Sequence, residues 1–375
     1  MLEQWYLEEL ISQPIRDIWK QTDYYLLRQI FNILHETGMF EDLQKGTTVD
    51  SLIAAKSFDP NVKSSLKWLL DRLAEDEYAT VSGDVYRLTD KPMTYDLEEV
   101  KNKAVSVAPN SVAAFNMLEL MAKNYPDYLA GRKTGVDIMF SAENMEATNE
   151  YYSNNLFYNV HNVCGAKVLN FDIESRKNPK ILEIGGGFGG GTKQFVKQRL
   201  ADGKSMTGFA YTFTDIANKM LRTAKRDLLT LTDDISSFSF TKLDFNKPLE
   251  QQGIAPNSLD VIWGVNAVHV AADMRFTLSE LLKALKPGGS LIACETVRPI
   301  GNRMIQQEFL LNTLHDYWDV KLDPPVRPRH GFMEWTDWIT AFKAIGFPKV
   351  ETVPDMAYLQ TQYDNCYCAV IRGTK

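Results

Sequence analysis

The sequence predicts an α/β fold with a Rossmann-like seven-stranded sheet, preceded by a mainly helical N-terminal domain of winged-helix-like pattern. Three observations predict this fold. From residue 180 onwards, short apolar runs alternate with segments of helical periodicity, as in a parallel sheet covered by helices on both faces. Six glycines between Gly185 and Gly191 follow the first apolar run. Residues 1–100 instead show helical spacing and one hairpin signal, and 375 residues are enough for two domains.

The first 100 residues predict helices and then a hairpin. Apolar residues at helical spacing predict a helix within residues 1–40. A short helix with Thr47 as its N-cap is expected next, and Asp59 followed by Pro60 marks the start of another. Two short strands are expected on either side of Gly83. The spacing of the first helix is carried by Leu26, Ile30, Ile33 and Leu34.

The order helix, helix, hairpin is a winged-helix pattern, which suggests DNA binding as one function. The charge argues against nucleic acid, since 48 acidic side chains outnumber 41 basic ones and the net charge is −7. Dimerisation or a wall of the active site is the better interpretation, and a sensor that signals through the winged helix is disfavoured for the same reason. The second helix offsets Lys63, Lys67 and Arg72 with Asp71, Glu75, Asp76 and Glu77.

Composition indicates neither a membrane protein nor a metal site. No apolar run approaches the ~20 residues that span a bilayer. The acidic, amphipathic start does not resemble a signal peptide, so we expect a cytoplasmic location. The four cysteines show no metal-type spacing with the five histidines, and we expect reduced thiols. These cysteines are Cys164, Cys294, Cys366 and Cys368.

We divide the chain into three parts. Residues 1–100 are expected to form the winged-helix-like dimerisation domain, and residues 101–170 a helical linker and active-site lid. Residues 171–375 would hold the cofactor-binding sheet, with a mostly helical, aromatic-rich cap at 300–345. We expect a homodimer, because residues 1–40 carry more apolar surface than a short helical lead needs. That surface includes Trp5, Tyr6, Ile11, Ile15 and Trp19.

The sheet is expected to be built from strands and helices in alternation. Helices are expected over residues 216–229 and 273–286, and LKPGG at 285–289 ends the second of them and turns into the next strand. The seven expected strands are 180–184, 206–215, 238–245, 259–265, 289–297, 350–353 and 366–372.

The strongest functional signal is the segment ILEIGGGFGGGT, residues 181–192. Glycines let a backbone turn sharply and approach a ligand without a Cβ in the way, and the next helix start offers free N–H groups to an anion. Such a loop alone would equally suggest a dinucleotide site. The acidic residue at the strand end resembles the methyltransferase pattern, where a carboxylate meets the ammonium of S-adenosylmethionine directly or through water. The cofactor-binding candidates are Glu183, Gly185, Gly187 and Gly189.

Residues at the ends of later strands add further cofactor-binding candidates. Asp215 ends the second strand, at about the distance where an acidic residue binds ribose hydroxyls, and it could also cap the following helix. Asp244 ends the third strand and could accept a hydrogen bond from an adenine amino group, or remain a surface carboxylate. Phe245, next to Asp244, and Asn266, after the fourth strand, are the remaining cofactor-binding candidates.

His269 and Glu295 are the catalytic candidates. His269 follows the fourth strand and Glu295 ends the fifth. The carboxyl ends of neighbouring strands converge on the ligand crevice of an open α/β sheet, where a histidine can act as base and a glutamate as its orienter. The alternatives are a structural histidine and a helix cap or ion-pair partner. If His269 is not the base, His161 and His330 are the next candidates.

These segments together resemble the C-methyltransferase domains of polyketide synthases, which use S-adenosylmethionine. The motifs are EIGGGFGGGT, YTFTDIA, VNAVHVAADMRFTL and LLKALKPGGSLIACE, with a Trp-containing tail, over roughly residues 135–375. The resemblance implies that His269 and Glu295 deprotonate the carbon between two carbonyls of a β-ketoacyl substrate, without a metal. It also implies an active-site tyrosine before the glycine loop, for which Tyr152 is the nearest match and Tyr151 a rival.

The chain also departs from that family. Phe188 stands where a threonine is common, and HVAADMR replaces the usual His-Ala-Thr-Arg-Asp stretch. No ketosynthase, reductase or carrier domain fits within 375 residues, so we expect a free-standing enzyme whose acyl substrate is a small molecule or is tethered to a carrier. The winged-helix-like front resembles small-molecule O-methyltransferases instead. O-methylation of a phenol or a carboxylic acid therefore stays open beside C-methylation.

Overall fold

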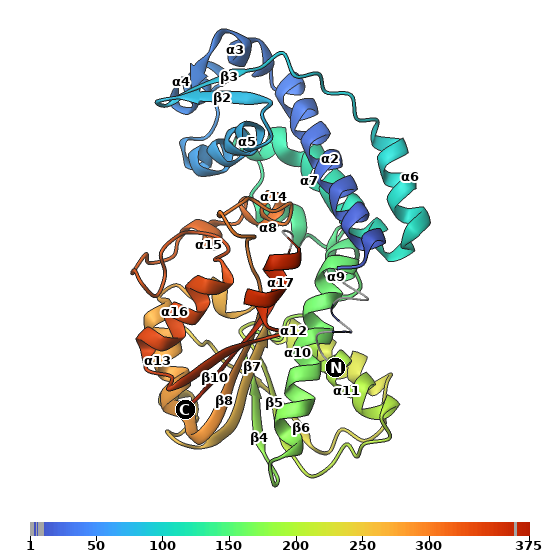
Figure 1. Cartoon of the computed structure of the whole chain (residues 1–375), viewed down its shortest axis with the longest axis vertical. Helices are drawn as coiled ribbons and strands as arrows, with labels where there is room; N and C mark the ends of the chain where they lie inside the picture. Colours follow the sequence, from blue (N-terminus) through green and yellow to red (C-terminus); the bar gives the residue numbers. More distant parts are fainter. Residues whose placement is uncertain (1–3, 5, 7–10, 364–365) are drawn as a thin grey trace. The chain divides into compact units, whose positions relative to one another are not determined.

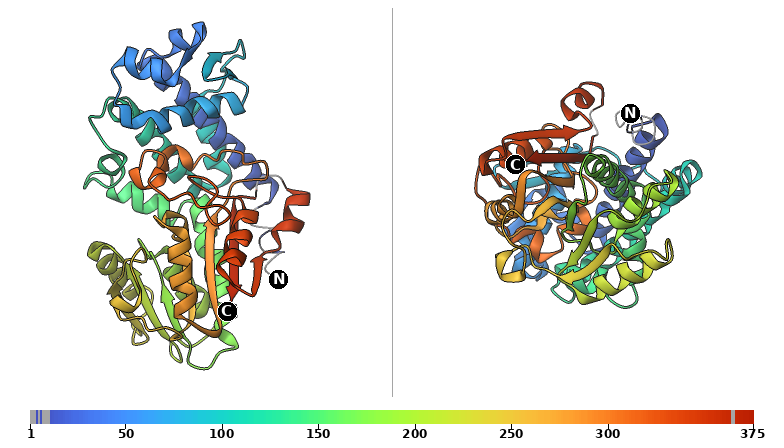
Figure 2. Two further views of the ribbon diagram at one scale, coloured as in Figure 1. Left: turned by 90° about the vertical axis from the view of Figure 1, so that its left-hand side faces the viewer. Right: turned by 90° about the horizontal axis from the view of Figure 1, so that it is seen from below.

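The chain folds into two compact units, which we describe separately (Figures 1 and 2). The expected boundaries at residues 100 and 170 differ from this division, since 101–156 groups with the N-terminal helices and 157–170 groups with the sheet. No helix among the described residues combines the length and the apolar character needed to cross a membrane. The computed structural model describes residues 4, 6, 11–363 and 366–375. Unit 1 comprises the described part of residues 1–11 with 157–302 and 319–375, and unit 2 comprises 12–156 and 303–318.

Unit 1 is built on a seven-stranded sheet, as the sequence predicted. Its strands are β4 (Lys180–Glu183), β5 (Ala210–Asp215), β6 (Phe238–Lys242), β7 (Leu259–Val265), β8 (Leu285–Thr296), β9 (Lys349–Val353) and β10 (Cys368–Thr374). They lie in the order β6-β5-β4-β7-β8-β10-β9. Neighbours from β6 to β8 are parallel, whereas β10 runs antiparallel to both β8 and β9. The sheet is therefore mostly parallel, with an antiparallel strand near one edge (Figure 1).

The order of the strands reverses between β4 and β7. From β4 the chain moves outward through β5 to β6, and it then returns to place β7 on the other side of β4. In open α/β sheets the ligand crevice lies at such a switch point, outside the carboxyl ends of the strands. The residues that end β4, β5, β7 and β8 therefore lie at the edge of the sheet where this rule places a ligand. These residues are Glu183, Asp215, Val265 and Thr296.

Helices cover both faces of this sheet. The first face carries α10 (Leu156–Glu174), α11 (Gly190–Ala201) and α12 (Asn218–Leu229), and the second carries α13 (Met274–Ala284) and α16 (Trp335–Ile345) (Figures 1 and 2). The close approach of α11 to β7 depends on Gly191, because a Cβ there would lie 2.9 Å from the Trp263 ring. Helix α17 (Met356–Gln362) lies between β9 and β10 in the chain.

Two details of unit 1 differ from the sequence prediction, and one agrees with it. LKPGG is part of β8 rather than a turn before it, because α13 already ends at Ala284. Strand β5 begins at Ala210, four residues later than expected, where its pairing with β4 starts. The cysteines Cys164, Cys294, Cys366 and Cys368 are buried free thiols, as predicted.

Unit 2 contains the expected helices and hairpin. Helix α2 (Gln13–Glu36) buries Leu26, Ile30, Ile33 and Leu34, the residues that predicted it. The elements after it are α3 (Phe40–Lys45), β1 (Thr47–Thr48), α4 (Val49–Lys56), η1 (Pro60–Val62), α5 (Lys63–Glu75), β2 (Ala79–Ser82), β3 (Val85–Leu88), α6 (Leu97–Val107), η2 (Pro109–Ser111), α7 (Val112–Leu129), α8 (Gly135–Met139) and α9 (Met145–Ser153). The three short strands form a sheet in the order β1-β3-β2.

The predicted cap of the short helix is wrong by one residue. Thr48, not Thr47, is the N-cap of α4, and its hydroxyl oxygen accepts a hydrogen bond from the Ser51 N–H at 3.1 Å. Thr47 instead pairs with Tyr86 in the small sheet. The start of the next helix is as predicted, since Asp59 accepts a hydrogen bond from the Asn61 N–H and Pro60 occupies the first turn.

A buried arginine joins residues 303–318 to the N-terminal helices of unit 2. Arg72 of α5 is 3% exposed, and its guanidinium lies 3.1 Å from the Asp23 carboxylate and 2.9 Å from that of Asp76. The same guanidinium donates to the Met304 carbonyl at 2.7 Å, and Glu75 accepts a hydrogen bond from the Met304 N–H. Charged side chains and main-chain groups therefore fix the beginning of this returning segment.

The predicted helical cap at 300–345 is only partly helical. Helices α14 (Glu308–Leu311) and α15 (His315–Trp318) lie in unit 2, and α16 completes the segment in unit 1. Residues 319–334 between them contain no helix. Three prolines explain this difference, because proline lacks the N–H that a helix needs and clashes with the preceding turn. These prolines are Pro324, Pro325 and Pro328.

The apolar residues that suggested a dimer interface are largely buried within the chain. Tyr6, Ile11 and Trp19 are 2%, 7% and 5% exposed, and the Tyr6 hydroxyl donates to the Cys368 carbonyl at 2.6 Å. Ile15 is partly exposed, and Trp5 lies outside the described residues. These side chains give little support to a dimer interface, and the homodimer stays a prediction.

Candidate active site

The glycine loop between β4 and α11 contains glycines of two kinds. Gly185, Gly187 and Gly189 have φ angles of +58°, +54° and +73°, which favour glycine. Gly186 is required for packing, since a Cβ there would lie 2.3 Å from the Phe213 ring. At Gly187 a Cβ would meet nothing within 4 Å. The loop therefore packs against the sheet at Gly186 and presents open space at Gly187.

Glu183, at the end of β4, lies inside a hydrogen-bonded network. Its carboxylate accepts hydrogen bonds from the Thr192 hydroxyl of α11 and from the Tyr211 hydroxyl of β5, the latter at 2.7 Å. The Trp263 indole N–H donates to that same Tyr211 oxygen at 3.0 Å. Glu183 is 1% exposed, and this burial raises the pKa of its carboxyl to about 7, although both hydroxyl donors favour the ionised form. The network joins the first strand to the first turn of the helix after the loop.

Asp215, at the end of β5, braces the glycine loop. One carboxylate oxygen accepts a hydrogen bond from the Gly187 N–H at 3.0 Å, and the other accepts one from the Ala217 N–H at 2.8 Å. The N-cap of α12 is Ala217, so the capping role considered for Asp215 is not observed. The carboxylate instead fixes the glycine at which the loop is open.

Asp244 and Phe245 follow β6 and differ in their surroundings. The Asp244 carboxylate accepts a hydrogen bond from the Asn246 N–H at 3.0 Å and lies 3.2 Å from the ammonium of Lys247. Phe245 is closer to the glycine loop, since a Cβ on Gly185 would lie 3.5 Å from its ring. The loop and this aromatic ring are therefore neighbours, whereas Asp244 takes part in local contacts of its own turn.

His269 and Glu295 form a buried pair. Nδ1 of His269 lies 2.6 Å from one carboxylate oxygen of Glu295, and the two residues are 8% and 0% exposed. The other carboxylate oxygen of Glu295 accepts hydrogen bonds from the N–H groups of Val268 at 2.8 Å and Ala267 at 3.3 Å. The glutamate thus orients both the imidazole and the turn that carries it, and Nε2 is the ring nitrogen that Glu295 does not contact.

Asn266 begins the same turn and is held by β8. Its side-chain oxygen accepts hydrogen bonds from the Thr296 N–H at 2.7 Å and from the Thr296 hydroxyl at 2.9 Å. That hydroxyl is also 3.1 Å from Nε2 of His161, a fully buried residue of α10. The turn contacts the glycine loop as well, since a Cβ on Gly185 would lie 3.0 Å from Cβ of Ala267. The glycine loop and the His269–Glu295 pair are therefore joined through residues 266–269.

The irregular segment 319–334 covers the histidine. The Phe332 ring centre lies 5.0 Å from that of His269. The Lys321 N–H donates to the Ala272 carbonyl, and the Lys321 ammonium lies 2.8 Å from the Asp273 carboxylate. Asp323 pairs with Arg275. Phe332 could not be identified from the sequence. Its segment has no periodic pattern of apolar residues, so nothing indicates which of its side chains face His269.

The alternative bases differ in their suitability. Both ring nitrogens of His161 have partners, since Nδ1 lies 3.0 Å from the Phe157 carbonyl and Nε2 faces Thr296. Burial lowers the pKa of His161 to about 4. This histidine is a structural group rather than a base. His330 lies in the 319–334 segment and is partly exposed.

The candidate tyrosines lie in unit 2. Tyr151 and Tyr152 are adjacent on α9, with ring centres 5.4 Å apart. Burial raises the pKa of both phenols. The choice between them as the active-site tyrosine stays a prediction.

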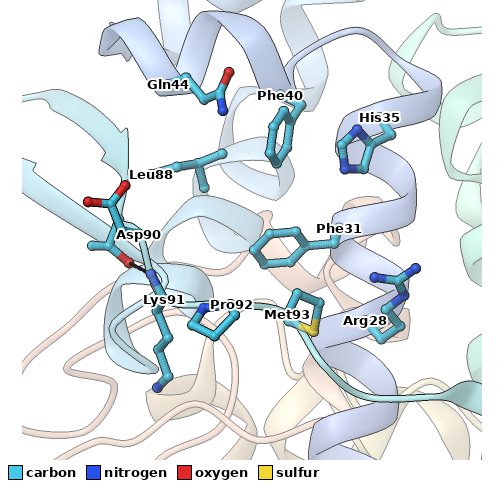
Figure 3. A pocket seen from close by; sticks show the side chains of 11 residues that line it. Arg28, Phe31, His35, Phe40, Gln44, Leu88, Asp90, Lys91, Pro92 and Met93 are labelled. Carbon is cyan, nitrogen blue, oxygen red and sulfur yellow. Dashed lines mark hydrogen bonds between the residues drawn. The ribbon is translucent and has the colours of Figure 1, made fainter.

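A cavity of about 550 Å³ in unit 2 contains none of the predicted site residues. Figure 3 shows it between α2 and the segment after β3, with Phe31, Phe40 and Arg28 around it. The His35 ring stacks on Phe40 with centres 4.1 Å apart. Among the residues that line this cavity, no hydrogen bond between a histidine and a carboxylate is observed, in contrast to the His269–Glu295 pair of unit 1.

A family match covers the central part of unit 1. Residues 182–291 match the family described as "Methyltransferase domain". This range begins next to Glu183 and contains the glycine loop, Asp215 and His269.

Curated relatives are much longer proteins. The chain is 31% identical over 275 residues to "Highly reducing polyketide synthase ACRTS2" from Alternaria alternata. This alignment covers 71% of this chain and 10% of that protein. It is 26% identical over 277 residues to "Highly reducing polyketide synthase 2" from Gibberella zeae, covering 72% and 10%. With "Compactin diketide synthase mlcB" from Penicillium citrinum the identity is 28% over 256 residues, covering 68% and 9%. The chain thus spans about a tenth of the length of the relatives it matches.

Solved structures share the whole fold. The structure of "DszA carbon methyltransferase" superposes with a TM-score of 0.81 at 20% identity. The superposition covers all of this chain and 92% of the DszA chain. "CurJ carbon methyltransferase" has a TM-score of 0.80 at 20% identity, covering 100% and 96%. The "citrinin polyketide synthase CMeT domain" has a TM-score of 0.80 at 16% identity, covering 99% and 93%. At these identities the likeness shows the fold.

Proposed function

We infer that this chain is an S-adenosylmethionine-dependent methyltransferase, as the sequence predicted. The family match over residues 182–291 supports the reaction type, and the shared fold confirms the predicted fold class. The glycine loop fits this cofactor, because it is open at Gly187 and has the acidic Asp215 and Glu183 beside it. When bound, S-adenosylmethionine supplies a methyl group on a sulfonium sulfur, which is a good leaving group.

Within this reaction type we propose transfer to an acidic carbon of a β-ketoacyl or polyketide-like compound. The curated relatives are polyketide synthases, and two structures of the same fold are named as carbon methyltransferases. The His269–Glu295 pair suits such an acceptor, because a carbon flanked by two carbonyls needs a base of moderate strength and no metal. The substrate would be a free thioester or an acyl group on a carrier.

The proposed role of each residue follows from its contacts. Nε2 of His269 would take the proton from the acceptor carbon, and the electron pair would move onto the neighbouring carbonyl oxygen as an enolate. The enolate carbon would then form its bond to the methyl group as the sulfonium bond breaks. Glu295 would stabilise the imidazolium through Nδ1, and the proton would leave His269 for solvent. Tyr152 remains the proposed active-site tyrosine.

One observation carries this proposal: the 2.6 Å contact between His269 and Glu295 at the carboxyl ends of adjacent parallel strands. The turn that holds His269 also contacts the glycine loop through Ala267. The proposed base and the glycine loop thus belong to one edge of the sheet. This would hold the acceptor and the cofactor in the fixed geometry that in-line transfer requires.

O-methylation of a phenol or a carboxylic acid is the second candidate. A histidine after β7 can deprotonate a phenol as well as a carbon acid. The helix–helix–hairpin order of residues 47–88 is the observation that favours it, since it resembles the front of small-molecule O-methyltransferases.

The two functions differ in their products. We would incubate the protein with S-adenosylmethionine carrying a ¹³C methyl group and a 3-oxoacyl thioester of N-acetylcysteamine, and record ¹³C NMR of the product. We expect a methyl signal bonded to carbon. The matched control is the 2,2-dimethyl analogue, which has no proton on the carbon between the two carbonyls and should not react there. A methoxyl signal would show methylation of the enol oxygen and would contradict transfer to carbon, whereas a ¹³C-methoxyl product from a phenol or a carboxylic acid offered in place of the thioester would support the second candidate.

A further inference from the structure

The amide of Asn266 has a fixed orientation. The Thr296 main-chain N–H can only donate, so the atom that it contacts at 2.7 Å must be the amide oxygen of Asn266. The Thr296 hydroxyl has one proton, which can serve either this oxygen or Nε2 of His161, but the main-chain bond holds the amide in both cases. Nδ2 of Asn266 must therefore point away from β8.

Nδ2 of Asn266 is buried and has no hydrogen-bond partner among the described residues. A buried donor without an acceptor is unfavourable, and such groups are rare in folded proteins. Asn266 has a φ of +48°, a left-handed conformation that asparagine adopts more readily than most residues other than glycine. An unused buried donor at the end of a central strand points to a group that binds a ligand.

Three neighbouring main-chain donors are already used. The Asn266 N–H donates to the Cys294 carbonyl at 2.8 Å, and the Ala267 and Val268 N–H groups donate to Glu295. These three groups therefore do not serve a substrate oxygen. Nδ2 of Asn266 is the buried side-chain donor of this turn that has no partner among the described residues.

We propose that Nδ2 of Asn266 donates a hydrogen bond to the acceptor's carbonyl oxygen, which becomes the enolate oxygen when His269 removes the proton. The sequence had placed Asn266 among the cofactor-binding residues, and this proposal assigns it to the acceptor instead. It rests on the proposed function, because only a carbon acid forms an enolate. Asn266 would be a catalytic residue, and Thr296 would position it.

The charge that develops on the carbonyl oxygen explains the need for such a donor. A donor aimed at a developing oxyanion stabilises the transition state more than the ground state, and removing one such donor costs about 10²–10³ in rate. An amide is suited to this place, because it stays neutral and so leaves the base unperturbed. The turn is also held on both sides, by Glu295 and by Thr296, so the donor is placed before the substrate binds.

The test is proton exchange without methyl transfer. We would saturate the protein with S-adenosylhomocysteine, add the 3-oxoacyl thioester in D₂O, and measure by NMR the exchange of the acidic C–H above its rate in buffer. In Asn266→Gly, which removes the amide without strain at a positive φ, we expect the enzyme-dependent exchange to fall about 10²–10³-fold. Asn266→Asp keeps the bond to Thr296 and replaces the donor by an oxygen, and we expect at least as large a loss.

The matched control is Asn257→Gly. Asn257 also has a positive φ, +52°, and lies just before the same strand at its opposite end, where it is exposed. Its replacement should leave exchange unchanged. Exchange near the wild-type rate in both Asn266 variants would overturn the proposal and assign Nδ2 to a buried water. Loss of S-adenosylhomocysteine binding in either Asn266 variant would also overturn it, in favour of a cofactor role.

Failure of the proposed function would look different. In that case the wild-type protein itself would not accelerate exchange, or His269→Ala would exchange as fast as wild type. The Asn266 proposal is supported only if exchange depends on both His269 and Asn266 while binding of S-adenosylhomocysteine persists.

Discussion

Nδ1 of His269 lies 2.6 Å from one carboxylate oxygen of Glu295, whose other oxygen accepts the N–H of Val268, the residue before the histidine. One buried carboxylate therefore fixes both the ring and the main chain of the same turn. Such an arrangement determines which nitrogen carries the proton, because a carboxylate on Nδ1 leaves Nε2 to act as the base.

Replacing Gly187 by valine should abolish cofactor binding. The substitution puts a branched side chain into the open space of the loop and forces a residue with a Cβ to adopt a φ of +54°. The measurement is calorimetric titration with S-adenosylhomocysteine. The control is Gly203→Val, since Gly203 also has a positive φ, +65°, and open space around its Cβ position, but lies after α11. Both variants should lose similar stability, about 1–2 kcal/mol. Normal binding in Gly187→Val would refute the assignment.

Cofactor affinity should rise with pH through about 7 because of Glu183. Burial raises the pKa of its carboxyl to about 7, so in the free protein the group is largely protonated below that pH. A cofactor ammonium favours the ionised form, and binding must therefore release a proton below pH 7. We expect the dissociation constant of S-adenosylhomocysteine to fall between pH 5.5 and about 7.5, before the ligand's own α-amino group titrates.

The Glu183→Gln variant separates this effect from the titration of the ligand. Glutamine keeps the acceptor oxygen for Thr192 and Tyr211 but cannot ionise. Its affinity should be lower at pH 7.5 and nearly independent of pH in the same range. An equal pH dependence in both proteins would show that Glu183 does not interact with the ligand's charge.

Without bound cofactor, the Glu183 carboxyl should add to the free energy of unfolding at low pH. The pKa of Glu183 is higher in the folded than in the unfolded chain, so this contribution is full below the unfolded value of about 4.3 and is lost as the pH rises to about 7. Other groups titrate as well, and the contribution of Glu183 is therefore the difference between wild type and Glu183→Gln in denaturant unfolding.

Arg72→Met should strongly destabilise unit 2. The guanidinium is 3% exposed and contacts the carboxylates of Asp23 and Asp76, so its removal leaves acidic groups without their cation. Breaking a buried ion pair in this way costs about 3–5 kcal/mol. The measurement is the free energy of unfolding in urea. Lys63→Met, which removes the exposed partner of Asp50, is the control and should change it by less than about 1 kcal/mol. Equal effects would contradict the structural role of Arg72.

Much of the site in unit 1 could be predicted, because parallel strands place their carboxyl ends at one edge. The glycines, Asp215, His269 and Glu295 each follow or end a strand with a clear apolar pattern, and the sheet brings them together. The network around Glu183 could not be predicted. Tyr211 is 28 residues away in sequence, and its hydroxyl reaches Glu183 because β5 pairs with β4 in one register.

The course of residues 300–345 was predicted less well. The segment leaves unit 1, joins unit 2 over residues 303–318 and returns, and this path depends on contacts such as that between Arg72 and Met304. This aromatic-rich segment was expected to be mostly helical, but the prolines at 324, 325 and 328 exclude a helix there. Pairings between distant segments leave no periodic signal in a sequence.

The central claim is that His269, oriented by Glu295, removes the proton from the acceptor. The most direct test is the methyl-transfer rate of His269→Ala with saturating acceptor and cofactor, measured by mass spectrometry of the product. We expect a fall of about 10²–10⁴-fold, a smaller fall in Glu295→Gln, and S-adenosylhomocysteine binding intact in both. His315→Ala, which changes an exposed histidine, should react like wild type. A rate for His269→Ala close to that of the wild-type protein would contradict the account.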